Sequence, residues 1–79
     1  MTDRPTAPTR VPRLSYFFPA HNEEANLEPL VEEALATLPA IAETFEIVIV
    51  DDGSRDATPA IADRLAAAHP EVRAVHTPT

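Results

Sequence analysis

Residues 48–54, VIVDDGS, decide the fold of this 79-residue chain. The apolar run at residues 47–50 shows no alternation of apolar and polar side chains, which is typical of a strand covered on both faces of a parallel sheet. Two aspartates, a glycine and a serine follow at once. Since ligands of such sheets bind beyond the carboxyl ends of the strands, we predict that Asp51 and Asp52 lie at a binding edge.

A second polar cluster, residues 19–24 (PAHNEE), follows the preceding apolar segment in the same way. Residues 13–18 are rich in aromatic side chains and are predicted to form the first strand. The carboxyl ends of neighbouring parallel strands lie at the same edge of a sheet. The two clusters therefore predict one site built from two strand ends.

Helical segments separate the strands. Apolar residues at helical spacing follow Asn26, and a helix start there keeps Pro29 within the first turn, where proline is tolerated. Pro39 is expected to end this helix. A second helix is expected to begin with Thr58 as its cap, followed by a proline, and to stop at residues 69–70 (HP).

With strands at residues 13–18, 45–50 and 72–76, the predicted order is β-α-β-α-β. Helical connections imply parallel strands with right-handed crossovers, so the fold class is α/β, a Rossmann-like parallel half-sheet. Two helices are too few for both faces of the sheet. We therefore expect residues 13–79 to be the amino-terminal part of a larger, incomplete domain, preceded by a disordered tail over residues 1–12.

The bulk composition excludes several classes of protein. The net charge of −7 argues against a surface for nucleic acid or anionic lipid. The absence of cysteine fits a reducing compartment. No apolar run approaches the roughly 20 residues of a membrane span, and the first 12 residues resemble no signal peptide. A cytoplasmic location is expected, at the inner face of a membrane if segments beyond residue 79 anchor it.

The acid pair has a chemical interpretation. Asp51, at a strand end, could accept hydrogen bonds from the ring N–H groups of uracil or guanine, which adenine lacks. The backbone of Ile49 and Val50 would line one side of that base. Asp52 and Val50 are counted among the candidate binding residues, but Asp52 could instead accept backbone N–H groups from the turn at residues 53–54, a structural role.

The first cluster leaves more alternatives open. Glu23 could accept a ribose hydroxyl, or it could be a helix N-terminal or solvated carboxylate. His21 could stack on a base or only fill the loop. Asn22 is expected to cap the helix or brace the loop, and Glu24 is expected to face solvent.

The sequence lacks the residue patterns of two other kinds of site, a glycine-rich phosphate loop and a histidine metal site. Gly53 is the only glycine, so there is no glycine-rich phosphate loop, and a bound diphosphate would need a divalent metal. The spacing of His69 and His76 is not that of metal ligands. The metal's carboxylate ligands are expected beyond Thr79.

Together, residues 18–24 (FPAHNEE) and 49–58 (IVDDGSRDAT) resemble the amino-terminal part of family 2 glycosyltransferases, which include the dolichyl- and polyprenyl-phosphate sugar transferases. The resemblance covers residues 14–79. It implies a GT-A fold and an inverting transfer of sugar from a UDP- or GDP-sugar, with a divalent metal (Mg²⁺ or Mn²⁺) and possible polyprenyl-phosphate acceptors. The residues implied for the nucleoside pocket are Pro19, Ala20, His21 and Glu23, and Asp51 keeps its contact with the base.

The chain departs from the family pattern at two positions, His21 and Ala57, where members often carry tyrosine and glycine. The family's metal-binding D-x-D and its acceptor side lie on later segments, so residues 1–79 alone are expected to be inactive. Three alternatives remain: a signalling receiver domain with a magnesium-binding acid pair, a sugar-nucleotide pyrophosphorylase and a non-catalytic fragment. The receiver would require an acid after the third strand, and the pyrophosphorylase would require a glycine-rich opening loop.

Overall fold

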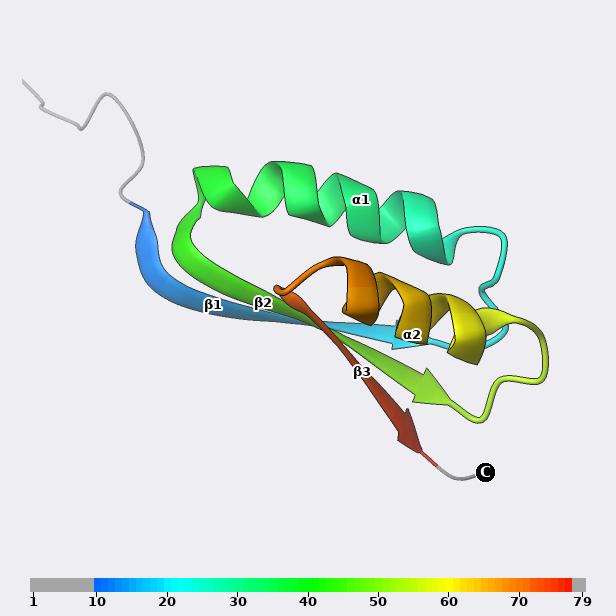
Figure 1. Ribbon diagram of the computed structural model, residues 1–79. Coiled ribbons are helices and arrows are strands. Elements are labelled where there is room, and N and C mark those ends of the chain that lie inside the picture. Colours follow the sequence, from blue (N-terminus) through cyan, green and yellow to red (C-terminus); the bar gives the residue numbers. More distant parts are fainter. Residues whose placement is uncertain (1–9, 78–79) are drawn as a thin grey trace, which may run out of the picture.

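Strands and helices alternate along residues 10–77, the part of the chain that the computed structural model describes. Figure 1 shows three strands side by side with two helices packed on them. The elements are β1 (Val11–Ala20), α1 (Leu27–Thr37), the 3₁₀ turn η1 (Leu38–Ala40), β2 (Ala42–Asp52), α2 (Thr58–Ala68) and β3 (Val72–Thr77). This order and the α/β class confirm the prediction from the sequence.

The three strands form one parallel sheet in the order β1-β2-β3, with β2 in the centre. At the carboxyl end of the sheet, Ala20 of β1 is the register partner of Asp51, and Asp51 is the partner of His76 on β3. The last residues of all three strands therefore lie at the same edge. We call this edge, with the loops that follow β1 and β2, the rim.

Both helices lie on the same side of the sheet (Figure 1). Two right-handed crossovers that run in the same direction along a sheet place their helices on one face. We call this side the covered face and the opposite side the open face. Within residues 10–77 helices therefore cover one face only, and cover of the second face stays a prediction. Val48 of the open face is nevertheless only 1% exposed, because its strand is central and flanked by β1 and β3.

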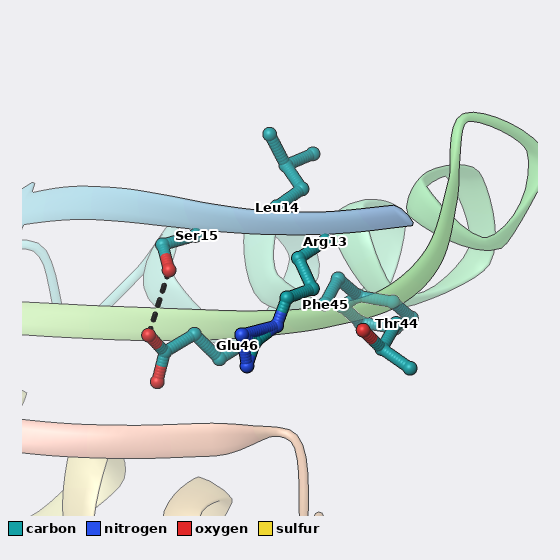
Figure 2. A pocket seen from close by; sticks show the side chains of 6 residues that line it. All are labelled: Arg13, Leu14, Ser15, Thr44, Phe45 and Glu46. Atoms are coloured by element: carbon teal, nitrogen blue, oxygen red, sulfur yellow. Dashed lines mark hydrogen bonds between the residues drawn. The ribbon is translucent and has the colours of Figure 1, made fainter. Parts of the chain in front are cut away.

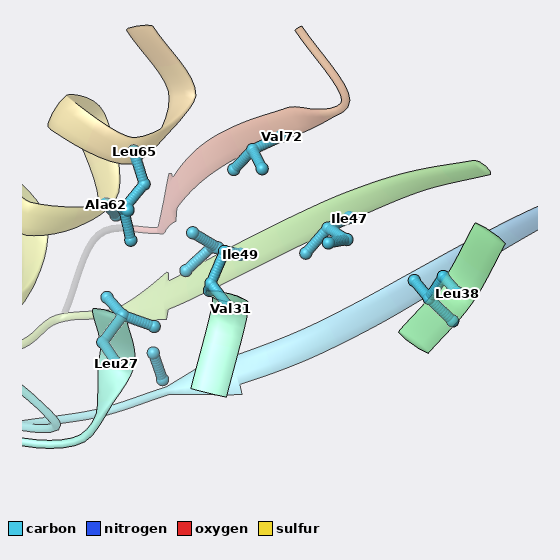
Figure 3. Close-up of a cluster of buried hydrophobic side chains, with 9 residues drawn as sticks. Leu27, Val31, Leu38, Ile47, Ile49, Ala62, Leu65 and Val72 are labelled. Carbon is cyan, nitrogen blue, oxygen red and sulfur yellow. The ribbon is translucent and has the colours of Figure 1, made fainter. Parts of the chain in front are cut away.

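The hydrophobic core fills the space between the covered face and the helices (Figure 3). Ile47 and Ile49 point into it from β2, since alternate residues of a strand share a face. Both helices contribute fully buried side chains: Leu27 and Val31 come from α1, and Leu65 comes from α2. This packing sets the position of each helix over the strand ends.

The first strand is longer than predicted at both ends. It begins at Val11, where the backbone N–H donates to the carbonyl of Ile41 at 2.8 Å, so residues 11–12 belong to the sheet rather than to the predicted tail. It continues through Pro19 to Ala20, because an edge strand tolerates a residue without an N–H. Residues 1–9 of the predicted tail lie outside the described residues.

The helix starts fall where they were expected, but their caps differ. Asn26 occupies the N-cap position of α1, but its side chain makes no capping hydrogen bond. The side-chain amide of Asn26 instead donates to Glu23 Oε1 at 3.4 Å. Thr58 is the first residue of α2, and its own N–H donates to Asp56 Oδ1 at 2.9 Å. The capping role predicted for Thr58 is wrong, since a carboxylate two residues earlier supplies the acceptor. Neither helix of residues 10–77 has the length and apolar character needed to cross a bilayer.

Candidate functional site at the carboxyl end of the sheet

Two loops meet at the rim. Residues 21–26 follow β1 and residues 53–57 follow β2, and the two segments lie next to each other at the arrowhead end of the strands (Figure 1). Although about 30 residues separate them in the sequence, each loop supplies hydrogen-bonding side chains to the backbone of the other. The structure thus brings the two polar clusters together at the rim, and their service as one binding site stays a prediction.

The first half of the loop contact involves the residues closest to the strands. His21 Nδ1 lies 2.7 Å from the carbonyl oxygen of Asp52. The N–H of Asn22 donates to Ser54 Oγ at 2.9 Å, and Asn22 Oδ1 accepts the N–H of Arg55 at 2.8 Å. Asn22 is thus the loop brace that the sequence analysis allowed.

The second half of the contact lies nearer to the helices. The N–H of Glu23 donates to Thr58 Oγ1 at 2.8 Å, and that of Glu24 donates to Asp56 Oδ2 at 3.2 Å. In return, Glu24 Oε1 accepts the N–H of Ala57 at 2.8 Å. Glu24 is exposed, as expected, but its carboxylate serves the other loop rather than solvent alone.

Two positive φ angles allow the loops to approach each other. Gly53 has φ 65°, which glycine adopts at no steric cost, and this accounts for the single glycine of the chain. Asn22 has φ 54°, and asparagine is among the few other residues that enter this region readily. Residue types at two key positions therefore follow from backbone geometry.

Asp51 points to the covered face and is only 3% exposed. Its Oδ1 accepts the N–H of Ser54 at 3.3 Å, and its Oδ2 lies 2.9 Å from His76 Nδ1. Burial by itself raises the pKa of Asp51, but the hydrogen bonds from Ser54 and His76 outweigh it and leave the pKa below its ordinary value. The turn-bracing role predicted for Asp52 thus belongs to Asp51, because strand alternation turns Asp51 toward the protein interior.

His76 is the residue that sequence reasoning missed. Its Nδ1 faces Asp51, and its Nε2 lies 2.8 Å from Asp63 Oδ1 on α2. The hydrogen bonds to Asp51 and Asp63 raise the pKa of His76. The only available signal was its position at the end of the third predicted strand, beside the strand that ends in the acid pair.

Asp52 has the opposite orientation. It is exposed, and Thr77 Oγ1 donates to its Oδ1 at 3.0 Å. By strand alternation it lies on the open face, together with Val50 and with Pro19, which is the register partner of Val50. Of the two adjacent aspartates, Asp52 is therefore the one whose carboxylate solvent reaches.

The seven residues predicted to bind a nucleotide sugar divide into three groups. Pro19, Val50 and Asp52 share the open face at the rim, while Ala20 and Asp51 are buried on the covered face. The other two belong to the first loop: His21 is exposed, and Glu23 is half-buried with its carboxylate 3.4 Å from the Asn26 amide. All seven lie at one end of the sheet, but a ligand reaches the open-face and loop groups more readily than the buried pair.

The described residues of the rim contain no preformed group of metal ligands. Within residues 10–77, no three histidine, cysteine, aspartate or glutamate side chains are arranged to hold a metal ion. Asp51 uses both carboxylate oxygens for Ser54 and His76, and Asp52 has one oxygen engaged by Thr77. These carboxylates already have protein hydrogen-bond donors as partners.

A separate hollow lies on the first halves of β1 and β2, away from the rim (Figure 2). Its lining is a mixture of charged, polar and apolar side chains: Arg13, Leu14, Ser15, Thr44, Phe45 and Glu46. The Ser15 hydroxyl donates to Glu46 Oε2 at 2.7 Å, and Arg73 lies 3.8 Å from the same carboxylate. Of the lining residues, only Ser15 and Glu46 form a hydrogen bond with each other, so the hollow holds fewer organised polar contacts than the rim.

The sequence of this chain is similar to those of several known glycosyltransferases. Glycosyltransferase AglD of Haloferax volcanii is 39% identical over 77 residues, which cover 94% of this chain and 12% of that protein. The dolichyl-phosphate beta-glucosyltransferase ALG5C of Trichomonas vaginalis is 35% identical over 69 residues, or 81% of this chain and 20% of the relative. The undecaprenyl-phosphate 4-deoxy-4-formamido-L-arabinose transferase of Shewanella sediminis is 39% identical over 62 residues, or 78% and 18%.

The chain thus spans one fifth or less of the length of these relatives. The family described as Glycosyl transferase family 2 matches residues 15–79, a stretch that includes β1 from residue 15 onward, both other strands, both helices and both rim loops. This match bears out the resemblance carried by the two motifs, and it does not favour the receiver or the pyrophosphorylase. Since the matched stretch is most of the sequence and contains the whole rim, the chain belongs to glycosyltransferase family 2.

Proposed function

We propose that residues 13–79 form the nucleoside-binding part of an inverting glycosyltransferase that transfers a sugar from a UDP- or GDP-sugar to an acceptor. The observation that carries the proposal is the exposed carboxylate of Asp52, held by Thr77 at the rim of a parallel sheet. A carboxylate in this position can accept the ring N–H groups of uracil or guanine, which adenine does not offer.

Asp52 takes the base contact in this proposal in place of Asp51. The carboxylate of Asp51 is buried and already bonded to Ser54 and His76, so a base would have to displace protein partners to reach it. Asp51 instead supports the strand end from the covered face. Pro19 and Val50, next to Asp52 on the open face, supply apolar surface for one side of a base.

The loop residues complete the proposed pocket. His21 is exposed beside the carbonyl of Asp52 and offers a ring for stacking. Glu23 offers a carboxylate to a ribose hydroxyl, and Ala20 packs beneath the loop without a polar group that competes for the ligand. Each role depends on the loop contact that fixes these residues relative to β2.

The acceptor proposed is a polyprenyl phosphate. Dolichyl phosphate and undecaprenyl phosphate occur in the names of two of the relatives described above, and an ionised phosphate oxygen is a nucleophile that needs little help from a base. Such a lipid would place the reaction at a membrane surface, here the cytoplasmic one. A divalent metal would stabilise the departing diphosphate. Its carboxylate ligands are proposed, as in the sequence analysis, to lie beyond Thr79.

Calorimetric titration of the full chain with UDP, GDP and ADP tests the donor site. UDP or GDP should bind about tenfold more tightly than ADP, since a hydrogen bond to a charged group contributes about 1.5 kcal/mol or more. Asp52→Ala should remove this preference. Glu43→Ala, an exposed acid at the other end of the same strand, is the matched control and should leave it unchanged.

Equal affinity for the three nucleotides, or an unchanged preference in Asp52→Ala, would contradict the base contact. Complete absence of nucleotide binding would favour a non-catalytic role. Transfer of labelled sugar from the corresponding nucleotide sugar to a polyprenyl phosphate, followed by lipid extraction, tests the acceptor separately; it requires a protein with the complete domain, since residues 1–79 alone are expected to be inactive.

A further inference from the structure

His76 connects three elements on the covered side of the rim. It lies at the end of β3, its Nδ1 is 2.9 Å from Asp51 Oδ2 on β2, and its Nε2 is 2.8 Å from Asp63 Oδ1 on α2. The carboxylate of Asp51 is buried, whereas the side chain of Asp63 is 66% exposed. One imidazole thus joins a buried and an exposed acid.

Both contacts require the imidazolium form. A neutral imidazole has one N–H donor and one lone pair, so it could donate to only one carboxylate and would turn a lone pair toward the other. The doubly protonated ring donates to both acids and compensates the buried charge of Asp51. Truncation of His76 would leave that charge without its cationic partner, which is costly in a buried position.

The neighbouring residue links this bridge to the proposed nucleotide contact. Thr77 follows His76 on β3, and its hydroxyl lies 3.0 Å from Asp52 Oδ1 and 3.3 Å from the carbonyl oxygen of Asp51. When His76 holds the end of β3 against β2, Thr77 is held beside the exposed carboxylate. The covered side of the rim thereby sets the geometry of the open side.

We propose that protonated His76 is a positioning residue for the donor site, and that nucleotide affinity falls when this imidazole loses its proton. The inference rests on the proposed function, because it assigns regulation to the same site. His76 contacts no ligand in this scheme; it acts through Asp51, Thr77 and the end of β3.

The direction of the pH effect follows from the groups that face His76. In the described part of the chain these are Asp51 from β2 and Asp63 from α2, both acidic. Their hydrogen bonds raise the pKa of His76, so its contribution is complete below the ordinary pKa and is lost as the pH rises through the raised value. The lowered pKa of Asp51 means that its contribution is lost only as the pH falls through that lower value.

The test is a calorimetric titration of the full chain with UDP and GDP over a series of pH values from about 6 upward. Wild-type affinity should fall about fivefold or more as His76 deprotonates. His76→Gln keeps a donor for Asp51 but does not titrate, so its affinity should be intermediate and independent of pH over this range. His69→Gln, a histidine outside the bridge, should retain the wild-type profile.

A second variant, Asp63→Asn, tests the same proposal in case His76→Gln fails to fold. Asp63→Asn removes only the exposed acid, so the pKa of His76, followed by the NMR shifts of its ring protons, should decrease. The pH at which nucleotide affinity falls should decrease with it. The nucleobase of UDP or GDP also titrates at high pH, but this contribution to the pH profile is the same for all variants and cancels when their profiles are compared.

The outcomes separate the two proposals. Binding by the wild type with the same pH profile in His76→Gln, or a fall in affinity that does not follow the His76 pKa in Asp63→Asn, overturns the positioning role and leaves the donor site standing. If the wild type binds neither nucleotide at any pH, the proposed function is overturned, and this inference falls with it.

Discussion

The two faces of the sheet differ in how the same strand uses its side chains. On the covered face, β2 contributes Ile47, Ile49 and Asp51, all of them buried. On the open face it contributes Val50 and Asp52, which remain accessible to different degrees. A single strand end therefore supplies one buried carboxylate that supports the fold and, at the next residue, one that is exposed at the rim.

This difference shows that adjacent acids in a motif need not share a role. Because successive side chains of a strand point to opposite faces, Asp51 and Asp52 lie on different sides of the sheet although they are adjacent in the sequence. The position of the helices, both on one side, then decides which acid is enclosed. Three substitutions test the contrast between the faces.

The largest effect is expected on the covered face. Ile49→Ala should lower the free energy of unfolding by about 2–5 kcal/mol, because a fully buried side chain is lost and a cavity remains between the sheet and both helices. Ile49→Val should cost only about 0.5–1.5 kcal/mol. Urea denaturation followed by circular dichroism measures both values, and similar losses for the two variants would contradict the packing described.

An intermediate effect is expected where the covered face meets the rim. Thr58 is buried, and its hydroxyl accepts the Glu23 N–H and donates to Asp56. Thr58→Val keeps the shape but leaves the Glu23 N–H without its partner, so stability should fall by about 1–3 kcal/mol.

Thr58→Ser is the matched control for this prediction, because it retains the hydroxyl and loses a methyl group. Amide hydrogen exchange should report faster exchange at Glu23 in Thr58→Val and near-native exchange in Thr58→Ser. If exchange at Glu23 were unchanged in Thr58→Val, the contact between the loops would not depend on this hydroxyl.

The smallest effect is expected on the open face. Phe17 is 60% exposed, whereas the next residue, Phe18, packs against the core. Phe17→Ser should change the free energy of unfolding by no more than about 0.5 kcal/mol. Phe18→Ser should cost more than about 1 kcal/mol by the same urea measurement. Equal costs for this adjacent pair would mean that the open face is as well packed as the covered one.

Much of the fold could be predicted from local patterns. The apolar run before Asp51, the prolines near the helix starts and the single glycine each indicate a strand, a helix or a turn, and the structure agrees with them. The strand ends were less predictable: residues 11–12 join β1 because Val11 finds a hydrogen-bond acceptor at Ile41, a contact made across 30 residues.

The candidate site was predictable in its location but not in its internal roles. Both clusters suggested the rim, yet the orientation of Asp51 depends on which face the helices cover, and composition does not reveal this. The contribution of His76 depends on the register between β2 and β3, which pairs it with Asp51. Such pairings arise from the whole sheet, so a pattern read along one segment does not contain them.

The reciprocal hydrogen bonds between the two rim loops have a consequence for how this family can recombine. A crossover anywhere within residues 27–52 would combine one loop from one parent with its counterpart from another. The side chains that bind the backbone of the opposite loop, such as Asn22 in the first loop and Ser54 in the second, would then come from different parents. Chimeras between relatives should therefore tolerate exchange of the entire stretch from residue 19 to residue 58 far better than a breakpoint inside it.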